Sequence, residues 1–246
     1  MTARKARPDA AEKTADEEPR DFVRYTFFHL RPEWRRLPAE TREDGKAAAA
    51  RVLEHPPEGV LVRTYSVAGL KAGAEMMVWS IGSDLGPLQE VHARLFGTPL
   101  GGYLDTPYSY LGMGRRSEYL GEHAHGGEGS ETRRRPLGLP YLFVYPFVKK
   151  REWYALPFEE RRRIMGEHFV RGHRYPKIRI HTGYSFGLDD MEFILGFEAE
   201  SPAEFLDLVS DLRSTEASRY TSLETPIFTC VLTSARRMLD LADGLS

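Results

Sequence analysis

The pattern of apolar and polar positions predicts two similar series of strands and helices along the chain. Aromatic and β-branched runs typical of strands lie near residues 22–30, 60–67, 76–81 and 108–113, and again near 141–148, 178–186 and 191–199. Helical periodicity occupies the intervals at about 39–54, 87–96, 157–171 and 201–212. The order strand, helix, strand, strand, helix therefore occurs twice.

Matching motifs indicate that the two halves are copies of one unit. Tyr25 and Trp34 recur as Tyr145 and Trp153, and each tryptophan is followed three residues later by Leu-Pro. A Gly-Leu pair before one strand, at 69–70, recurs at 187–188 before another. The offset stays between 118 and 120 residues. We therefore predict an α+β fold with two ferredoxin-like β-α-β-β-α modules in tandem, a dimeric α+β barrel, fused by a long linker.

Composition along the chain sets the expected boundaries. Residues 1–20 are rich in Ala, Lys, Glu and Asp without an aromatic residue, which predicts a disordered tail. Residues 117–140 are rich in glycine and charge, which predicts a linker loop of functional length. The expected modules are 21–116 and 141–236, and 237–246 is expected to be a second tail.

Charge and cysteine content exclude several classes of function. A net charge of −2, from 34 Lys+Arg against 36 Asp+Glu, argues against a nucleic-acid partner. The lone Cys230 excludes an internal disulfide and a cysteine-cluster zinc or iron–sulfur site. No apolar run approaches the roughly 20 residues that span a bilayer, and residues 1–20 lack the apolar middle of a signal peptide. We expect a cytoplasmic protein without a membrane span.

The two copies differ in their reactive side chains. His168 of the second copy stands opposite Ala49 of the first, on the face of its helix that also carries Ile164. A histidine at such a position is either a packed core residue or a metal ligand. The second copy also has the basic run 149–151 where the first has His29 and Arg31. Such a run is either a solvated strand edge or a clamp for carboxylates.

Several segments resemble the chlorite dismutase-like superfamily, and within it the coproheme decarboxylases. These segments are YPFVKKREWYALPFEERRRIMGEH (145–168), GLDDMEF (187–193), LRSTEASRY (212–220) and TPIFTC (225–230). The resemblance extends over about residues 21–232. It implies two ferredoxin-like modules, of which only the C-terminal one binds haem, and a homopentamer.

The resemblance also implies a reaction. Hydrogen peroxide and the iron of coproheme (iron coproporphyrin III) would convert Tyr145 to a radical, which removes hydrogen from a propionate β-carbon. Loss of CO2 and a further electron leaves a vinyl group, and two rounds give haem b through a three-propionate intermediate. Coproheme is thus substrate and redox cofactor together. His168, 23 residues after Tyr145, matches the family's axial iron ligand.

Further residues match positions that hold the propionates in the family. Lys149 lies four residues beyond Tyr145 on the same strand face and matches the lysine that holds the reacting propionate. Arg213 and Ser218 match the anchoring arginine and serine, and Arg219 is a further candidate. Trp153 either adjoins the porphyrin edge or simply packs, as Trp34 of the first copy would.

The residue that deprotonates peroxide stays open at this point. The matching strand, 177–182, places either Ile180 or His181 at the distal position, and Arg179 is out of register with it. The lack of an arginine there disfavours chlorite chemistry. Actinobacterial decarboxylases use a linker histidine as the distal base, for which His123 and His125 are candidates, with His181 as a substitute from the strand.

Two other functions remain as alternatives. One is chlorite dismutation to chloride and O2, and the other is a haem-binding or carrier protein without turnover. The presence of both Tyr145 and Lys149 favours the decarboxylase over these, because haem carriage requires neither residue. Expected partners are coproheme, hydrogen peroxide and further copies of the chain.

Overall fold

The computed structural model describes residues 19–119 and 132–245. The first half contains β1 (Phe22–Leu30), η1 (Pro32–Arg36), α1 (Ala39–Glu54), β2 (Val60–Ser66), β3 (Met76–Gly82), α2 (Leu85–Phe96), η2 (Gly101–Tyr103) and β4 (Leu104–Met113). The second half contains β5 (Tyr141–Lys149), α3 (Arg151–Ala155), α4 (Phe158–Gly172), β6 (Arg179–Tyr184), β7 (Phe193–Ala199), α5 (Pro202–Arg213), η3 (Glu216–Tyr220), β8 (Thr221–Leu223), β9 (Phe228–Leu232) and α6 (Ala235–Asp243).

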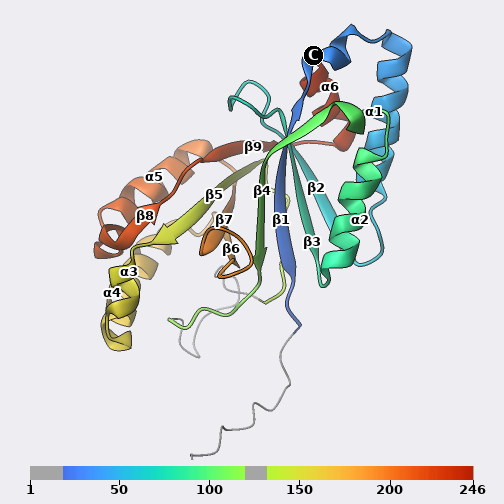
Figure 1. The fold of residues 1–246 in the computed structure, drawn as a ribbon. Helices are drawn as coiled ribbons and strands as arrows, with labels where there is room; N and C mark the ends of the chain where they lie inside the picture. Colours follow the sequence, from blue (N-terminus) through green and yellow to red (C-terminus); the bar gives the residue numbers. More distant parts are fainter. Residues whose placement is uncertain (1–18, 120–131, 246) are drawn as a thin grey trace, which may run out of the picture.

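The strands form one sheet that closes on itself. Its order is β7-β6-β4-β1-β3-β2-β9-β5-β8, and an additional β7–β5 pairing completes the ring (Figure 1). Within it, β4-β1-β3-β2 and β6-β7-β5-β9 repeat the same antiparallel order, which is that of a ferredoxin-like unit. The short β2–β9 and β4–β6 pairings join the two units. The predicted tandem ferredoxin-like fold is confirmed.

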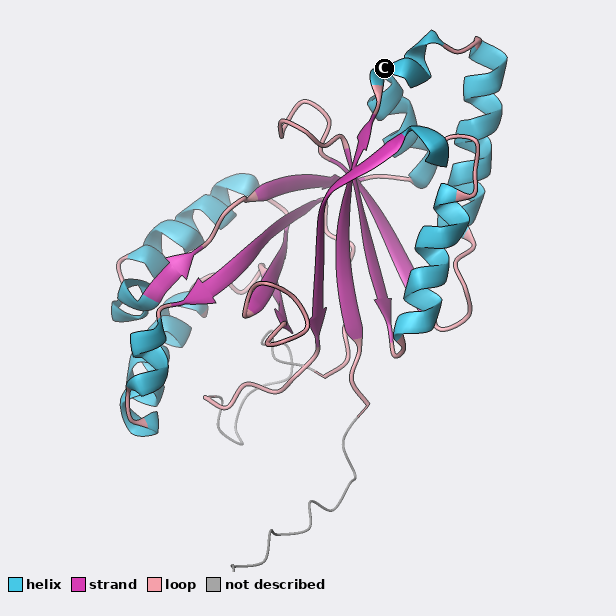
Figure 2. Ribbon diagram, viewed as in Figure 1, coloured by secondary structure: helices cyan, strands magenta, loops and turns pink. Residues whose placement is uncertain are grey.

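Side chains of both halves fill the inside of the barrel, while the helices lie outside it. The interior cluster combines Tyr25 and Trp79 from the first half with Val144, Ile194 and Phe228 from the second. Helices α1, α2 and α6 lie together on one side, and α3, α4 and α5 on the other (Figure 2). Alternation along each strand therefore gives one side chain to the barrel interior and the next to a helical layer.

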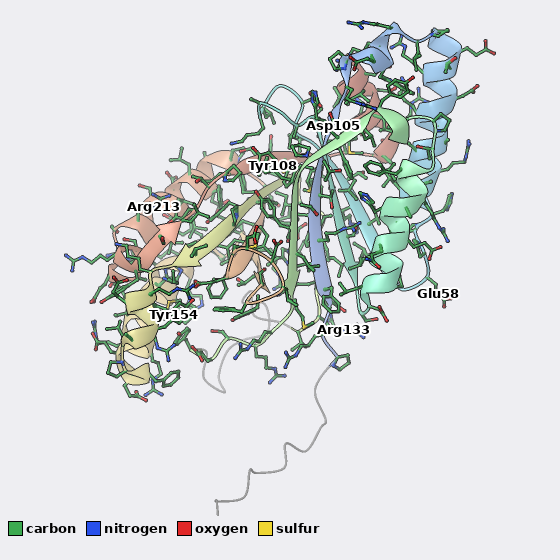
Figure 3. All side chains as sticks on the ribbon, in the orientation of Figure 1. Glu58, Asp105, Tyr108, Arg133, Tyr154 and Arg213 are labelled. Carbon is green, nitrogen blue, oxygen red and sulfur yellow. The ribbon has the colours of Figure 1, made fainter. Side chains whose placement is uncertain are left out.

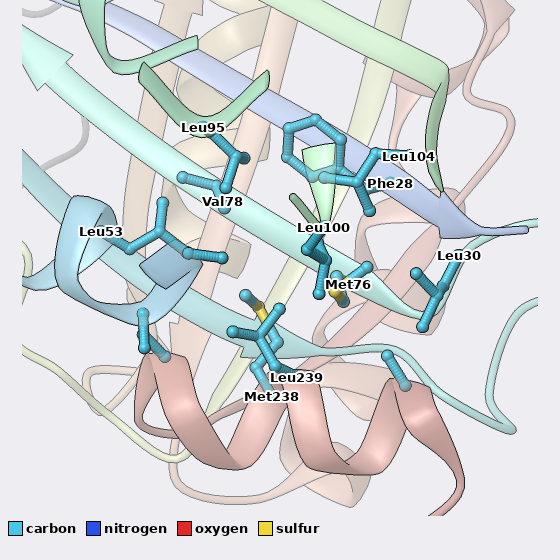
Figure 4. Packing of buried hydrophobic residues seen from close by; sticks show 14 of the residues in the cluster. Phe28, Leu30, Leu53, Met76, Val78, Leu95, Leu100, Leu104, Met238 and Leu239 are labelled. Carbon is cyan, nitrogen blue, oxygen red and sulfur yellow. The ribbon is translucent and has the colours of Figure 1, made fainter. Parts of the chain in front are cut away.

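The layer outside the first module is a dense apolar core (Figure 4). Leu53 of α1 and Leu95 of α2 pack over Met76 of β3, and α6 contributes Met238 and Leu239. Residues 237–243 are thus not a tail, and that expectation is wrong. A nine-residue helix is marginal by itself, and this one is stabilised by the core against which it packs.

Polar contacts also hold α6 in place. Lys46 of α1 is 1% exposed, and its ammonium group lies 2.6 Å from Asp240 and 3.4 Å from Asp243. Ser234 caps the helix at its start, where its side chain accepts a hydrogen bond from the Arg237 amide. The end of the chain is therefore part of the N-terminal layer.

Other boundaries differ slightly from the prediction. Strand β4 begins at Leu104, and a separate short helix, α3, precedes α4. Residues 1–18 of the expected tail 1–20, and residues 120–131 of the expected linker 117–140, lie outside the described residues. Among the helices that the structure describes, none is both long and apolar enough to cross a membrane.

Candidate functional site

Strand β5 carries two of the predicted site residues on one face. Tyr145 is 6% exposed, and its ring stacks on Phe197 of β7 with a centroid distance of 5.7 Å. Burial and the charge of Glu224 raise the pKa of Tyr145, against the opposing effect of Arg213. We call the face of β5, β6 and β7 on which Tyr145 lies the site face. Lys149 follows on this face, as the strand alternation predicts.

Helix α4 carries His168 on its inner face. This helix buries Ile164, one turn before His168, against Trp153 and Ala217. The Nδ1 atom of His168 is buried and has no hydrogen-bond partner among the described residues. Burial and the positive charge of Lys149 lower the pKa of His168 to about 4. The imidazole is therefore neutral near pH 7, as an axial ligand of haem iron must be.

The ammonium group of Lys149 lies among aromatic rings. It is 4.6 Å from the ring centroid of Trp153 and 5.3 Å from that of Phe147, and it donates a 3.3 Å hydrogen bond to the Ala217 carbonyl. Burial lowers the pKa of Lys149 to about 8, although Glu224 and Glu192 oppose the shift. The solvated-edge interpretation of this lysine is thus wrong, because its ammonium group lies among aromatic rings, where its charge acts on His168.

Trp153 is 2% exposed in α3. Its ring packs on Tyr220 at 5.3 Å and on Tyr119 at 6.1 Å, beneath the Lys149 ammonium group. Both interpretations of Trp153 therefore have support: it packs as Trp34 does in the first module, and it also borders Lys149.

Three predicted propionate-holding residues lie at the end of α5 and in η3. Arg213 pairs with Glu224, and its side chain is exposed (Figure 3). The hydroxyl of Ser218 donates to the Arg213 carbonyl at 2.7 Å and to the Thr215 carbonyl at 2.9 Å, which fixes this corner of the backbone. Arg219 is exposed. A guanidinium at this corner is a donor suited to carboxylates, whereas the Ser218 hydroxyl proton is used by the backbone carbonyls.

Two acidic residues of the site were not predicted. Glu224 follows β8, and its charge acts on Tyr145, Lys149 and Arg213. Glu192, just before β7, is 7% exposed and accepts hydrogen bonds from the Lys149 amide at 2.8 Å and from the Tyr154 hydroxyl at 2.7 Å. The motif GLDDMEF contained Glu192, but the partner of its carboxylate lies 43 residues away.

The structure does not bring His181 to the site face. Its ring contacts Trp79 inside the barrel at 5.0 Å, and its Nε2 lies 2.8 Å from Glu198. Ile180 instead packs in the cluster that contains Tyr145. The one-residue ambiguity is thereby settled, because a shift by one residue moves a side chain to the other face of a strand. His181 cannot serve as a site-face ligand or base.

His123 and His125, the other two candidates for the distal base, lie outside the described residues. The described start of the segment that follows them is well anchored. Asp21 accepts hydrogen bonds from the Arg133 side chain at 2.6 Å and from the Arg134 amide at 2.8 Å. The role of the linker histidines stays a prediction.

The residues on the site face, together with His168 of α4 and Arg213 of α5, fit an iron porphyrin that carries carboxylates. The neutral His168, with an unpartnered nitrogen, is suited to an iron atom, and Lys149 and Arg213 are suited to propionates. No cluster of three or more His, Cys, Asp or Glu side chains that could hold a free metal ion occurs among the described residues. A single histidine is sufficient for a metal already held by a porphyrin ring.

Fold and site together define a tandem ferredoxin-like barrel with a histidine-bearing site in one module only. The family model described as chlorite dismutase matches residues 42–233. The chain therefore belongs to the chlorite dismutase family.

Relatives and solved structures agree with this assignment. A coproheme decarboxylase of Mycolicibacterium smegmatis is 36% identical over 213 residues, which cover 84% of this chain and 89% of the relative. A coproheme decarboxylase of Thermus thermophilus is 30% identical, over 75% of this chain and 78% of the relative. The structure of chlorite dismutase from Candidatus Nitrospira defluvii in complex with imidazole matches with a TM-score of 0.82 and 25% identity, over 92% of this chain and 96% of that one.

Proposed function

We propose that the protein is a coproheme decarboxylase. It converts two propionates of iron coproporphyrin III to vinyl groups with hydrogen peroxide and gives haem b through a three-propionate intermediate. The observation that carries the proposal is the joint placement of a buried tyrosine and a half-buried lysine on the site face, with a neutral histidine whose pKa is lowered by burial and by the lysine charge. The 36% identity to a coproheme decarboxylase supports it.

Each residue of the site has a distinct part in this reaction. His168 binds the iron of the substrate through a neutral ring nitrogen. Lys149 holds a propionate carboxylate, and Arg213, at the corner that Ser218 fixes, binds another at the edge of the site. Trp153 supports the Lys149 ammonium group from below.

Tyr145 carries the redox step. Its raised pKa keeps the phenol protonated at neutral pH, so it gives up a proton and an electron together. The bound substrate supplies the iron at which peroxide is reduced. In each round, a propionic acid group loses CO2, two protons and two electrons to become a vinyl group, and one H2O2 takes up these protons and electrons to give two H2O. Tyr145 returns to the phenol at the end of the round.

We also propose that the protein works in the cytoplasm as a homopentamer, with a linker histidine, His123 or His125, as the base for peroxide. Membership of the chlorite dismutase family supports these statements. Sedimentation of the full chain with coproheme bound tests the assembly. Substitution of each linker histidine by alanine tests the assignment of the base. Loss of the base should lower the reaction rate with peroxide and leave the affinity for the substrate unchanged.

The Tyr145→Phe variant tests the reaction itself. The full chain is loaded with iron coproporphyrin III, peroxide is titrated, and the porphyrin products are followed by mass spectrometry. We expect two successive losses of CO2 with wild type, and a rate below about 1% of wild type with Tyr145→Phe. Tyr25→Phe is the control, because Tyr25 also lies on the first strand of its module but faces the barrel interior, whereas Tyr145 faces the helical layer.

Two outcomes would contradict the proposal. If wild type bleaches the porphyrin without forming vinyl groups, the protein binds haem but does not carry out this reaction. Evolution of O2 from chlorite at a rate above the decarboxylation rate would favour chlorite dismutation. Ile180 argues against the second outcome, because it puts an apolar side chain at the position of the site face where a cation is expected for that reaction.

A further inference from the structure

Glu192 lies at the corner of the chain that carries Lys149. Strand β5 ends at Lys149 and α3 begins at Arg151, so the chain turns sharply there. The pairing of β5 with β8 shifts register between Val148 and Lys149, which is a bulge. Bulges re-aim side chains and are common beside active sites. The Lys149 amide at this bulge donates to the Glu192 carboxylate.

The carboxylate of Glu192 joins several groups around that corner. Its Oε2 accepts from the Lys149 amide at 2.8 Å and from the Tyr154 hydroxyl at 2.7 Å, and its Oε1 lies 3.5 Å from the Arg151 guanidinium. A carboxylate that is 7% exposed is costly to bury unless such partners satisfy it. Because the partners are the Lys149 amide itself and two side chains that follow it within five residues, the carboxylate restricts how the backbone presents the lysine.

The backbone of Glu192 is held in turn from the first module. The Ser185 amide donates to the Glu192 carbonyl at 2.8 Å, and the Ser185 hydroxyl donates to the Leu111 carbonyl at 2.7 Å. The Leu111 amide donates to Asp189 at 2.8 Å. Strand β4 of the module without a site is therefore connected through the 185–192 turn to the corner that carries Lys149.

The first module contains the same contact without a site. Glu75 precedes β3 as Glu192 precedes β7, and it accepts from the Leu30 amide at the end of β1 at 3.0 Å. The residue whose amide is held there, Leu30, is fully buried in the apolar core. The contact between a glutamate before the third strand and the end of the first strand is thus common to both modules. Only in the second does it hold a residue of the site.

We propose that Glu192 is a positioning residue for substrate binding, which fixes the backbone at Lys149 so that the ammonium group meets a substrate propionate. The inference rests on the proposed role of Lys149. Glu75 provides a matched control inside the same chain, because its backbone contact is equivalent and its module carries no site. A structural role alone would affect both glutamates alike, whereas a positioning role makes only Glu192 matter for the substrate.

The experiment compares Glu192→Ala, Glu192→Gln and Glu75→Ala in the full chain. Amide hydrogen exchange of the apo protein is measured at Lys149 and Leu30, and the Kd for iron coproporphyrin III is measured without peroxide. We expect each alanine variant to speed exchange at its own amide. We expect Glu192→Ala to weaken coproheme binding on the order of 10-fold, as loss of an orienting partner does in metal sites, while Glu75→Ala changes it less than about twofold.

A double-mutant cycle adds a readout that a merely structural role would not move. If Glu192 acts through Lys149, Glu192→Ala causes no further loss of affinity in a Lys149→Met background. Equal losses of affinity in both backgrounds, or equal effects of the Glu75 and Glu192 variants, would overturn the inference. Should Glu192→Ala not fold, Glu192→Gln and Tyr154→Phe still test the inference. The first replaces the carboxylate by a neutral amide and the second removes the hydroxyl that donates to it, each with almost no change of shape.

The outcome is separable from that of the proposed function. Affinity and exchange are measured without peroxide, so they hold whether or not the wild type decarboxylates its ligand. Wild-type protein that binds coproheme without turnover would refute the decarboxylase proposal and leave the positioning of Lys149 intact. Decarboxylation by wild type, together with an affinity for coproheme that Glu192→Ala does not change, would support the decarboxylase proposal and refute the positioning role of Glu192.

Discussion

The two modules share one topology but differ in how much of their long outer helix is buried. Helix α1 buries Lys46, Ala49, Ala50 and Leu53 along its length, whereas α4 buries Ile164 alone. The first module also receives α6 on its outer layer, where Met238 and Leu239 join its apolar core. The comparison teaches that the predicted site residues lie in the copy whose long helix buries fewer of its own side chains.

A glycine and an isoleucine at equivalent positions account for part of this difference. In α1, a Cβ atom on Gly45 would lie 2.6 Å from the Trp34 ring, so the glycine permits close approach of the helix. The equivalent residue of α4, at the same offset as Trp153, is Ile164, which packs against that tryptophan with a full branched side chain. Ile164 therefore fills the space beside Trp153 with a side chain, where Gly45 leaves that space to the Trp34 ring. His168 lies one turn beyond Ile164.

The largest expected effect comes from exchanging the residues that distinguish these two helices. His168→Ala should abolish the Soret shift on addition of iron coproporphyrin III, because it removes the proposed iron ligand. It should change the free energy of unfolding of the apo protein by less than about 1 kcal/mol, since the Nδ1 atom has no partner to lose. Absorbance titration and denaturant unfolding measure the two quantities.

Ala49→His is the converse variant. Ala49 is fully buried in the first module, so a histidine there should destabilise the protein by at least about 1 kcal/mol and bind no porphyrin. His173→Ala controls for loss of a histidine near His168, because His173 is exposed and directly follows the last residue of α4. A normal Soret shift in His168→Ala would contradict the assignment of the ligand.

Much of the site was predictable because it depends on local periodicity. The strand alternation places Tyr145 and Lys149 on one face, and the helical repeat places His168 beside Ile164. The tandem fold followed from the recurring Trp and Leu-Pro positions. These features depend on neighbours within a few residues, so the sequence carries them directly.

The parts that were missed depend on distant partners. Helix α6 has too few residues to be recognised from periodicity and is stable through the N-terminal core. Glu192 and Glu224 act on groups in other elements, and no local pattern specifies such pairs. For Glu192 a signal did exist, since an acidic residue precedes the third strand in both copies, as Glu75 does in the first.

A smaller effect tests the close approach of α1. Gly45→Ala should lower the free energy of unfolding by about 1–3 kcal/mol, because the added methyl group overlaps the Trp34 ring. Gly166→Ala in α4 is the matched control, because a Cβ there meets nothing within 4 Å. It should raise stability by about 0.5–1 kcal/mol through helix propensity. Equal effects of the two substitutions would show that the Trp34 ring does not restrict the residue at position 45.

The smallest predicted effect is a pH dependence that only the second module has. Burial lowers the pKa of Lys149 to about 8, so in the free protein its ammonium group is charged below that pH and neutral above it. A bound propionate favours the charged form and raises this pKa. Substrate affinity should therefore be constant below about pH 7 and fall above pH 8, by at most about tenfold per pH unit. Fluorescence or absorbance titrations between pH 6.5 and 10 measure it.

Lys149→Arg isolates this contribution. A guanidinium keeps its charge throughout the range, so the variant should lose the part of the pH dependence that belongs to Lys149 and retain any part that belongs to the iron or the porphyrin. His168, with a pKa of about 4, stays neutral over the whole range and does not contribute. Identical pH profiles for wild type and Lys149→Arg would mean that Lys149 does not hold a substrate carboxylate. The site would then depend on Arg213 for its charge, at the exposed end of α5.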